Sequence, residues 1–178
     1  MAMTLITTNT SSGAATSDFT SSIDNTYKLY IFKWYDVNPA ADPWASFTFQ
    51  ANVVGASGYN ETITSTYFSA YHQEDDDPAA MGYGSGSDQA QGTAFQKLAA
   101  STGNNADQSS AGTLWLFNPS NTTYVKHFYA TVNNHQEVPT SSNEFIAGYF
   151  NVTGAIDEIQ FKMDSGNFDG TIKMYGVG

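Results

Sequence analysis

The sequence predicts an all-β fold, a two-sheet antiparallel sandwich of jelly-roll type with eight to nine strands. Apolar and polar residues alternate over several short segments, which is the period of a strand with one buried face. Gly, Asn, Pro and Ser separate these segments at the spacing of turns. No segment has the apolar spacing of a helix. A sandwich of this size is commonly one undivided domain.

The strongest strand pattern covers residues 26–37. Leu29 and Ile31 share one face of this expected strand with Tyr27. Its opposite face carries three large rings, Tyr30, Phe32 and Trp34. One sandwich core can receive only one of the two faces, and three exposed rings would form an unusually large apolar patch. We therefore expect the three rings to lie at or near an interface with another subunit.

Further strands are expected in six segments: Ser46–Val54, Glu61–His72, Thr93–Ala99, Thr113–Phe117, Thr123–Val132 and Glu144–Val152. Residues 93–99 could also form a helical turn, and a strand is favoured because helices are absent elsewhere. The turn residues 118–121 predict a hairpin between the strands that flank them. Residues 155–178 predict one C-terminal hairpin, with Ile159, Phe161 and Met163 facing the core.

Residues 1–25 predict an extended N-terminal arm, and residues 26–178 the single sandwich domain. The arm is rich in Thr and Ser and has too few apolar residues to order itself alone. A short strand at residues 4–8 or docking on a neighbouring subunit would order it. The interface is expected to include Met3, Leu5 and Ile6 from this arm. Trp44, Tyr59 and Tyr83 lie in expected loops, where such rings pack on a subunit or stack on a sugar, and we assign Trp44 to the interface.

The composition restricts the partners. The 178-residue chain has 17 acidic and six basic residues, and its formal net charge is −11. All basic residues are lysines, so nucleic acid and anionic membranes are not expected as partners. The absence of cysteine fits folding in a reducing cytoplasm. Residues 1–10 lack the basic start and apolar run of a signal peptide.

An acidic run is the best metal candidate in the sequence. It consists of Glu74, Asp75, Asp76 and Asp77, and Ca²⁺ binds loop carboxylates of this kind. Consecutive carboxylates point in different directions, however, and the run lacks the alternating spacing of a calcium loop. A solvated surface loop is therefore the favoured interpretation, and no metal or cofactor is expected.

No motif in the sequence indicates catalysis. The three histidines, His72, His127 and His135, fall in separate segments. Neither a Gly-x-Ser-x-Gly turn nor a His-Glu-x-x-His pair is present. Carboxylates such as Asp157 and Glu158 could in principle form the catalytic pair of a glycoside hydrolase, but Glu158 is expected to face solvent. We therefore expect a protein that is not an enzyme.

Three segments resemble one family of proteins. The ending Gly170–Gly176, GTIKMYG, resembles the last strand of many tailed-phage virion structural proteins, of the head decoration and tail-fibre head-domain types. Residues 112–119 with residues 122–126 are similar to a hairpin of these proteins, and residues 156–161 to their penultimate strand. The three segments keep their order and cover about the last two-fifths of the chain. They are structural rather than catalytic motifs.

This resemblance implies a capsid decoration or cement protein that binds the major capsid protein and stabilises the head shell. Its expected location is the exterior of the virion, and self-association as a homotrimer is expected. The alternative is a tail-fibre or spike head module that binds a host-surface glycan. Copy number separates the two, because a cement protein covers the whole shell whereas fibre heads are few.

Overall fold

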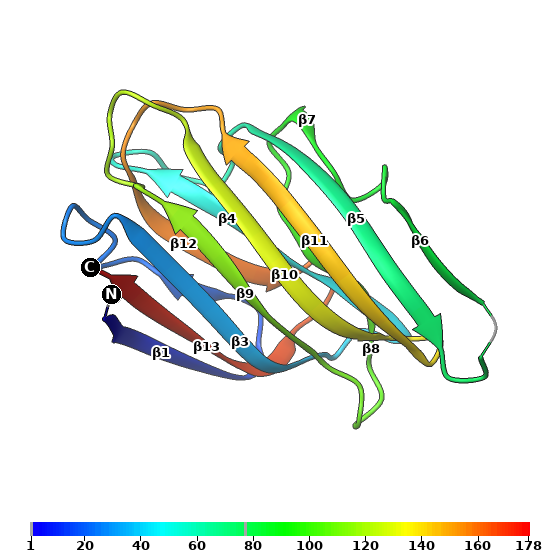
Figure 1. Ribbon diagram of the computed structural model, residues 1–178. Coiled ribbons are helices and arrows are strands. Elements are labelled where there is room, and N and C mark those ends of the chain that lie inside the picture. The colour runs from blue at the N-terminus through cyan, green and yellow to red at the C-terminus, as the bar shows by residue number, and fades with distance from the viewer. Residues whose placement is uncertain (1, 77) are drawn as a thin grey trace.

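The computed structural model describes residues 2–76 and 78–178 and is all-β (Figure 1). The all-β prediction is therefore confirmed. Strands and turns make up the described residues, and they contain no helix that could cross a membrane. The thirteen strands are β1 (Met3–Ala14), β2 (Ser17–Phe19), β3 (Leu29–Pro39), β4 (Trp44–Val53), β5 (Ile63–Gln73), β6 (Ala79–Tyr83), β7 (Ala90–Gly92), β8 (Gln96–Gly103), β9 (Ser110–Phe117), β10 (Lys126–Gln136), β11 (Thr140–Phe150), β12 (Ile156–Met163) and β13 (Phe168–Val177).

Antiparallel pairing divides these strands into two runs. The eight-strand run has the order β1-β13-β3-β9-β10-β11-β5-β6, and the short strand β7 also pairs with β5. In Figure 1 it crosses the front of the molecule from β1 to β6. The four-strand run, β8-β4-β12-β2, lies behind it. Only one residue pair in the described ladders, Gln136 with Thr102, joins the two runs.

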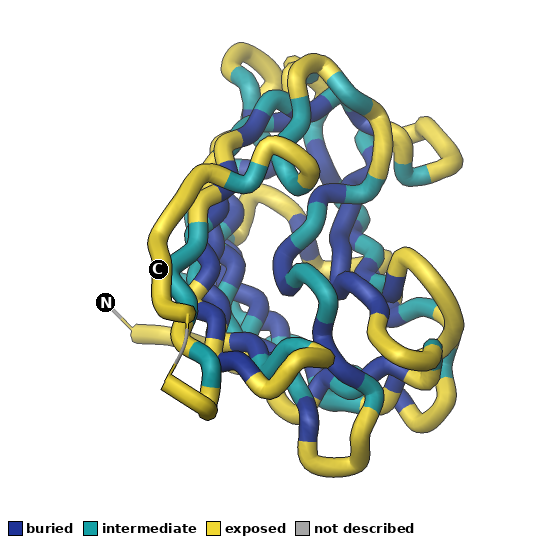
Figure 2. Tube along the Cα trace, turned by 90° about the vertical axis from the view of Figure 1, so that its right-hand side faces the viewer, coloured by how far each residue is buried: buried dark blue, intermediate teal, exposed yellow. Residues whose placement is uncertain are grey.

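The core lies between the two runs. Figure 2 shows buried positions along the interior of the molecule, while the loops at its ends are exposed. Phe161 of β12 is the centre of an aromatic cluster in this core. Its ring centroid lies 5.5 Å from that of Phe32, 5.7 Å from that of Phe47 and 6.0 Å from that of Phe19. Such ring pairs stabilise a core beyond the area they bury.

The expected interface role of Tyr30, Phe32 and Trp34 is wrong. All three side chains point inward from β3 and have 0% exposure. Trp34 packs on Phe47 at 5.5 Å between ring centroids, and the Tyr30 hydroxyl receives a hydrogen bond from the Asp24 backbone amide at 2.9 Å. The core between the two runs receives these three rings, so Leu29 and Ile31 face outward.

The strand count of eight to nine is also too low. Four of the thirteen strands, β1, β2, β6 and β7, lie where an arm or loops were expected. All side chains of β6 are exposed, so no alternation of apolar and polar residues marks it. It forms because its backbone extends the edge of the sheet along β5. Backbone pairing of this kind leaves little trace in side-chain pattern.

The segment expected as an extended arm, residues 1–25, contributes two strands to the sheet, β1 and β2. β1 pairs with β13 over nearly its whole length, and β2 pairs with β12. Asn9 ties the two segments together, because its side chain donates hydrogen bonds to the Ser17 hydroxyl at 3.2 Å and to the Asp18 carbonyl at 2.9 Å. The N-terminal segment is therefore ordered by its own chain.

The C-terminal hairpin is a second correction. β12 pairs with β4 and β2, whereas β13 pairs with β1 and β3. The two strands thus belong to different runs, and the turn at residues 164–167 crosses from one run to the other. Alternation identified both strands but could not identify their partners. The expected hairpin around residues 118–121 is confirmed, because β9 and β10 are paired directly.

One lysine is buried where this β9–β10 hairpin meets the end of β11. Lys126 has 0% exposure, and its Nζ donates hydrogen bonds to the backbone carbonyls of Tyr124, Val152 and Thr153 at 2.8, 3.3 and 3.2 Å. Burial lowers the pKa of this amino group. The three carbonyls accept all three of its donors, so the side chain fixes the 119–125 loop to the segment that follows β11.

Candidate docking surface

The outward face of the eight-strand run is the side turned away from the core. Residues opposite one another in the ladders share a face, so the face can be followed as rows across the sheet. The central row is Leu5, Tyr175, Ile31, Trp115, Tyr129, Ala147 and Thr66. The next row is Thr8, Lys173, Lys33, Thr113, Thr131, Phe145, Phe68 and Tyr83.

This outward face is rich in exposed apolar groups. Twelve large apolar or aromatic side chains of the described residues remain exposed. Eight of these lie here: Met3, Leu5, Tyr35, Phe68, Met81, Tyr83, Phe117 and Tyr129. A contiguous exposed patch of this kind marks a site of interaction more often than chance.

Stacked rings stiffen the face. Trp115 and Tyr129 stack at 4.3 Å between centroids, and Phe117 lies 5.8 Å from Tyr129 on the other side. Phe68 and Phe145 form a second stack at 4.9 Å. Rings held against their neighbours lose little side-chain entropy when a partner covers them. The face is therefore preorganised for contact.

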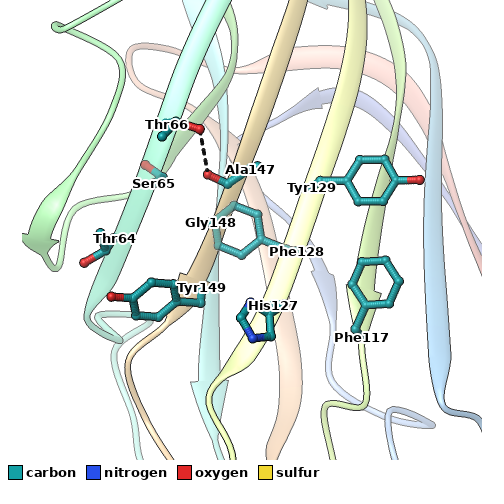
Figure 3. Close-up of a pocket in the computed structure, with 10 residues that line it drawn as sticks. All are labelled: Thr64, Ser65, Thr66, Phe117, His127, Phe128, Tyr129, Ala147, Gly148 and Tyr149. Atoms are coloured by element: carbon teal, nitrogen blue, oxygen red, sulfur yellow. Dashed lines mark hydrogen bonds between the residues drawn. The ribbon is translucent and has the colours of Figure 1, made fainter.

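A shallow hollow of about 450 Å³ lies on this face beside Ala147. Figure 3 shows Tyr129 and Phe117 on one side of it and Thr64 and Thr66 on the other. The hollow exists because Ala147 has a small side chain between larger neighbours. A second hollow, which shares Tyr129 and Ala147, is bordered by Phe68 and Phe145. Both are open depressions in a broad surface rather than a closed cleft.

The outward positions in the two central rows carry no carboxylate in the described residues. Asp36, at the bulge of β3, and Asp169, near the start of β13, are exposed at one end of the face. Two lysines, Lys33 and Lys173, lie in the central part of the face. In a chain of net charge −11 the carboxylates are therefore kept away from these two rows.

The remaining expected interface residues fall in different places. Met3 and Leu5 lie on the outward face with 48% and 51% exposure, while Ile6 packs against the core. Trp44 is 42% exposed at the start of β4, in the four-strand run. The structure thus brings together two of the seven expected residues on this face, and the larger set around Tyr129 was not foreseen.

Two residues of the acidic run contact different histidines. The His72 imidazole donates a hydrogen bond to the Asp76 carboxylate at 2.9 Å, and Glu74 lies 3.8 Å from His135. Across residues 2–76 and 78–178 no cluster of three His, Cys, Asp or Glu side chains is arranged to hold a metal ion. Asp77 lies outside the described residues. His127 is exposed on the outward face, where its ring meets that of Tyr149.

A buried polar network lies near the seam between the two runs. Glu144 of β11 has 0% exposure, and its carboxylate accepts hydrogen bonds from the Ala100 amide at 3.1 Å and from the Asn134 side chain at 3.2 Å. Asn134 in turn accepts a hydrogen bond from the Thr102 hydroxyl at 2.8 Å. Burial raises the pKa of Glu144 to about 7, although these hydrogen bonds oppose the shift. The network connects β8, β10 and β11 and has no opening to substrate.

Replacing Glu144 with glutamine is expected to stabilise the protein above pH 7 by about 3 kcal/mol. The folded-state pKa is raised to about 7 from the ordinary 4.5, so the folded protein retains a proton that the unfolded chain has lost. The free energy of unfolding of the wild type therefore falls as pH rises through this window. Urea unfolding of both proteins at pH 5 and pH 8 measures the difference. A difference that does not grow with pH would contradict the assignment.

Comparison with known proteins gives little. No family model matches the chain, and none of the curated proteins matches it. One solved structure with a weak likeness is described as the structure of infectious bursal disease virus Gt strain. It has 7% sequence identity, a TM-score of 0.18 and coverage of 98% of this chain. The chain spans about a third of that protein's length, at 35%, and the likeness carries no argument about function.

The sequence did contain a signal for the outward face. In β9, Leu114 and Leu116 point inward, while Trp115 and Phe117 between them point outward. A strand with large apolar residues at both parities predicts a covered second face. The same pattern in β3 predicts a second covered face, but Tyr30, Phe32 and Trp34, expected there, face the core.

Proposed function

We propose that this chain is a non-enzymatic structural protein of a tailed-phage virion, which decorates the capsid exterior and stabilises the head shell by binding the major capsid protein. The observation that carries the proposal is the aromatic outward face, whose two central rows carry no carboxylate. Contact with a shell requires a broad surface, and interface cores are enriched in aromatic residues and depleted in charge. The resemblance of residues 112–119, 122–126, 156–161 and 170–176 to virion proteins also supports it.

The same proposal includes a jelly-roll-like sandwich and a homotrimer. Its two sheets would be the eight-strand and four-strand runs, and the single residue pair between them supports this division. The Tyr30, Phe32 and Trp34 side chains cannot hold the trimer together, because they are buried within the chain. Contacts between subunits would instead use exposed residues, and light scattering of the free protein measures its oligomeric state.

Replacing both Phe68 and Met81 with serine is expected to weaken attachment to head shells by at least about tenfold. The two side chains are 43% and 76% exposed, so the fold needs little from them. Burial of such a side chain on a partner is worth about 1.5–3 kcal/mol, and about 1.4 kcal/mol corresponds to a factor of ten in affinity. Shells that lack the chain are mixed with wild type or variant, and the bound fraction is measured by sedimentation.

The matched control replaces Val54 and Trp44 with serine. These residues are also exposed, at 63% and 42%, but they lie off the outward face. Attachment of the control should equal that of wild type. Equal weakening of both variants, or none in the first, would show that another surface makes the contact. Failure of wild type to bind shells at any concentration would exclude the decoration role.

A second candidate is a fibre or spike head that binds a host-surface glycan. The observation that favours it is the hollow beside Ala147, which is lined by the rings of Tyr129 and Tyr149 and by Thr64 and Thr66. Small-molecule sites combine apolar walls with a few polar groups in this way. Titration of the wild type with neutral methyl glycosides separates the candidates, since a decoration protein has no need to bind them.

A further inference from the structure

Two lysines lie side by side on the outward face. Lys33 of β3 and Lys173 of β13 are directly opposite each other in the antiparallel ladder. Like charges in this position destabilise a sheet, because the two side chains leave the same surface a few ångströms apart. Their neighbours in the same row, Thr8 and Thr113, are uncharged. The structure thus carries an unfavourable pair in the middle of its most apolar face.

The chain does not relieve this repulsion itself. It has 17 acidic residues, yet no ion pair between a lysine and a carboxylate is found within residues 2–76 and 78–178. Other lysines have alternative contacts: Lys126 donates to three carbonyls, and the Lys162 amino group lies 4.2 Å from the Phe95 ring centroid. The amino group of Lys173 lies 5.8 Å from the Tyr35 ring centroid, which keeps it over the outward face.

We propose that the partner of the outward face is a protein surface that presents carboxylates to Lys33 and Lys173 within an otherwise apolar contact. This inference rests on the proposed function and specifies the chemistry of the capsid patch that the chain would bind. Complementary charge fixes the register of an interface and excludes wrong partners. The absence of carboxylates from the two central rows lets an acidic patch approach the lysines without repulsion there.

A second copy bound through the same face fits the charges poorly. Such a contact is isologous, so each residue of the face meets other residues of the same face. The two central rows have no carboxylate, so four lysines that met there would be buried without counter-charges, which is costly. A sugar in the hollow beside Ala147 would not contact the two lysines, because neither of them lines that hollow or the one next to it.

The free protein provides the first test. The Lys173→Glu change turns the repulsive pair into an attractive one and is expected to raise the melting temperature by roughly 1–3 °C. Lys173→Gln, which removes the charge only, should give a smaller rise. A melting temperature that is unchanged or lower in both variants would show that the pair is not strained, and would overturn the first premise.

The second test uses the same head shells as the proposed function. Reversal of both charges, Lys33→Glu with Lys173→Glu, is expected to weaken attachment by more than about tenfold, whereas the double arginine variant should stay within about threefold of wild type. Attachment of wild type should also slow as salt rises, and that of the double glutamine variant should not. If wild type attaches and the reversed variant attaches equally well, this inference alone is overturned. If wild type fails to attach, the decoration role and this inference fall together.

Discussion

A chain truncated after Gly170 is expected to lose cooperative folding. The deletion removes most of β13, which is the only strand of the described chain that pairs with both β1 and β3. It also removes Ile172 and Met174, which have 0% exposure in the core. Burial of two such side chains contributes about 3–6 kcal/mol. The whole stability of a domain is about 5–15 kcal/mol, so little would remain.

Near-ultraviolet circular dichroism and urea unfolding measure this loss. The matched control deletes only Gly178, which is exposed and lies beyond the end of β13. The control should unfold like the full chain. A truncated protein with the melting temperature of the full chain would mean that β1 and β3 can close the sheet without β13, and the assigned role of this strand would be wrong.

Replacing Phe161 with alanine is expected to cost about 3–5 kcal/mol of unfolding free energy. Phe161 has 0% exposure, and its ring contacts those of Phe19, Phe32, Phe47 and Phe49. The change leaves a cavity where strands of both runs meet, and the surrounding strands cannot close it. Denaturant unfolding at constant pH measures the effect.

The Phe68→Ala variant is the matched control, because the same ring is removed from the outward face. Phe68 is 43% exposed and stacks on one ring, Phe145, so a loss of about 1 kcal/mol is expected. A comparable loss in the two variants would mean that the outward face supports the fold as strongly as the core does. The face would then be a poor candidate for docking.

Periodicity was sufficient for the strands that separate a polar from an apolar face. It located β12 and β13, because each buries alternate residues against the core. It did not locate β6, whose side chains are all exposed, or the end of β10, where Asn134 is buried in a polar network that resembles a loop in sequence. Periodicity also could not identify which strands pair, because alternation is the same whichever neighbour a strand has.

The candidate docking surface was predictable only in part. Both faces of residues 26–37 carry large apolar side chains, but nothing in the sequence says which face the core receives. In the structure the core receives the larger side chains. Phe32 and Trp34 fill the space between the two runs, whereas Ile31 points outward. The opposed lysines could not have been foreseen at all, because the pair depends on the register of β3 against β13.

The buried Lys126 allows the opening of the 119–125 loop to be followed by chemical labelling. The other five lysines reach solvent, whereas Lys126 is hidden with its amino group on three carbonyls. An amine-reactive acylating reagent would therefore modify these five lysines rapidly, and it would modify Lys126 only when the 119–125 loop moves away. The slow labelling rate of that single site, followed by mass spectrometry, would report the opening of this loop, in solution or on a particle. In a chain without cysteine, this lysine fastens two segments with no dependence on redox conditions.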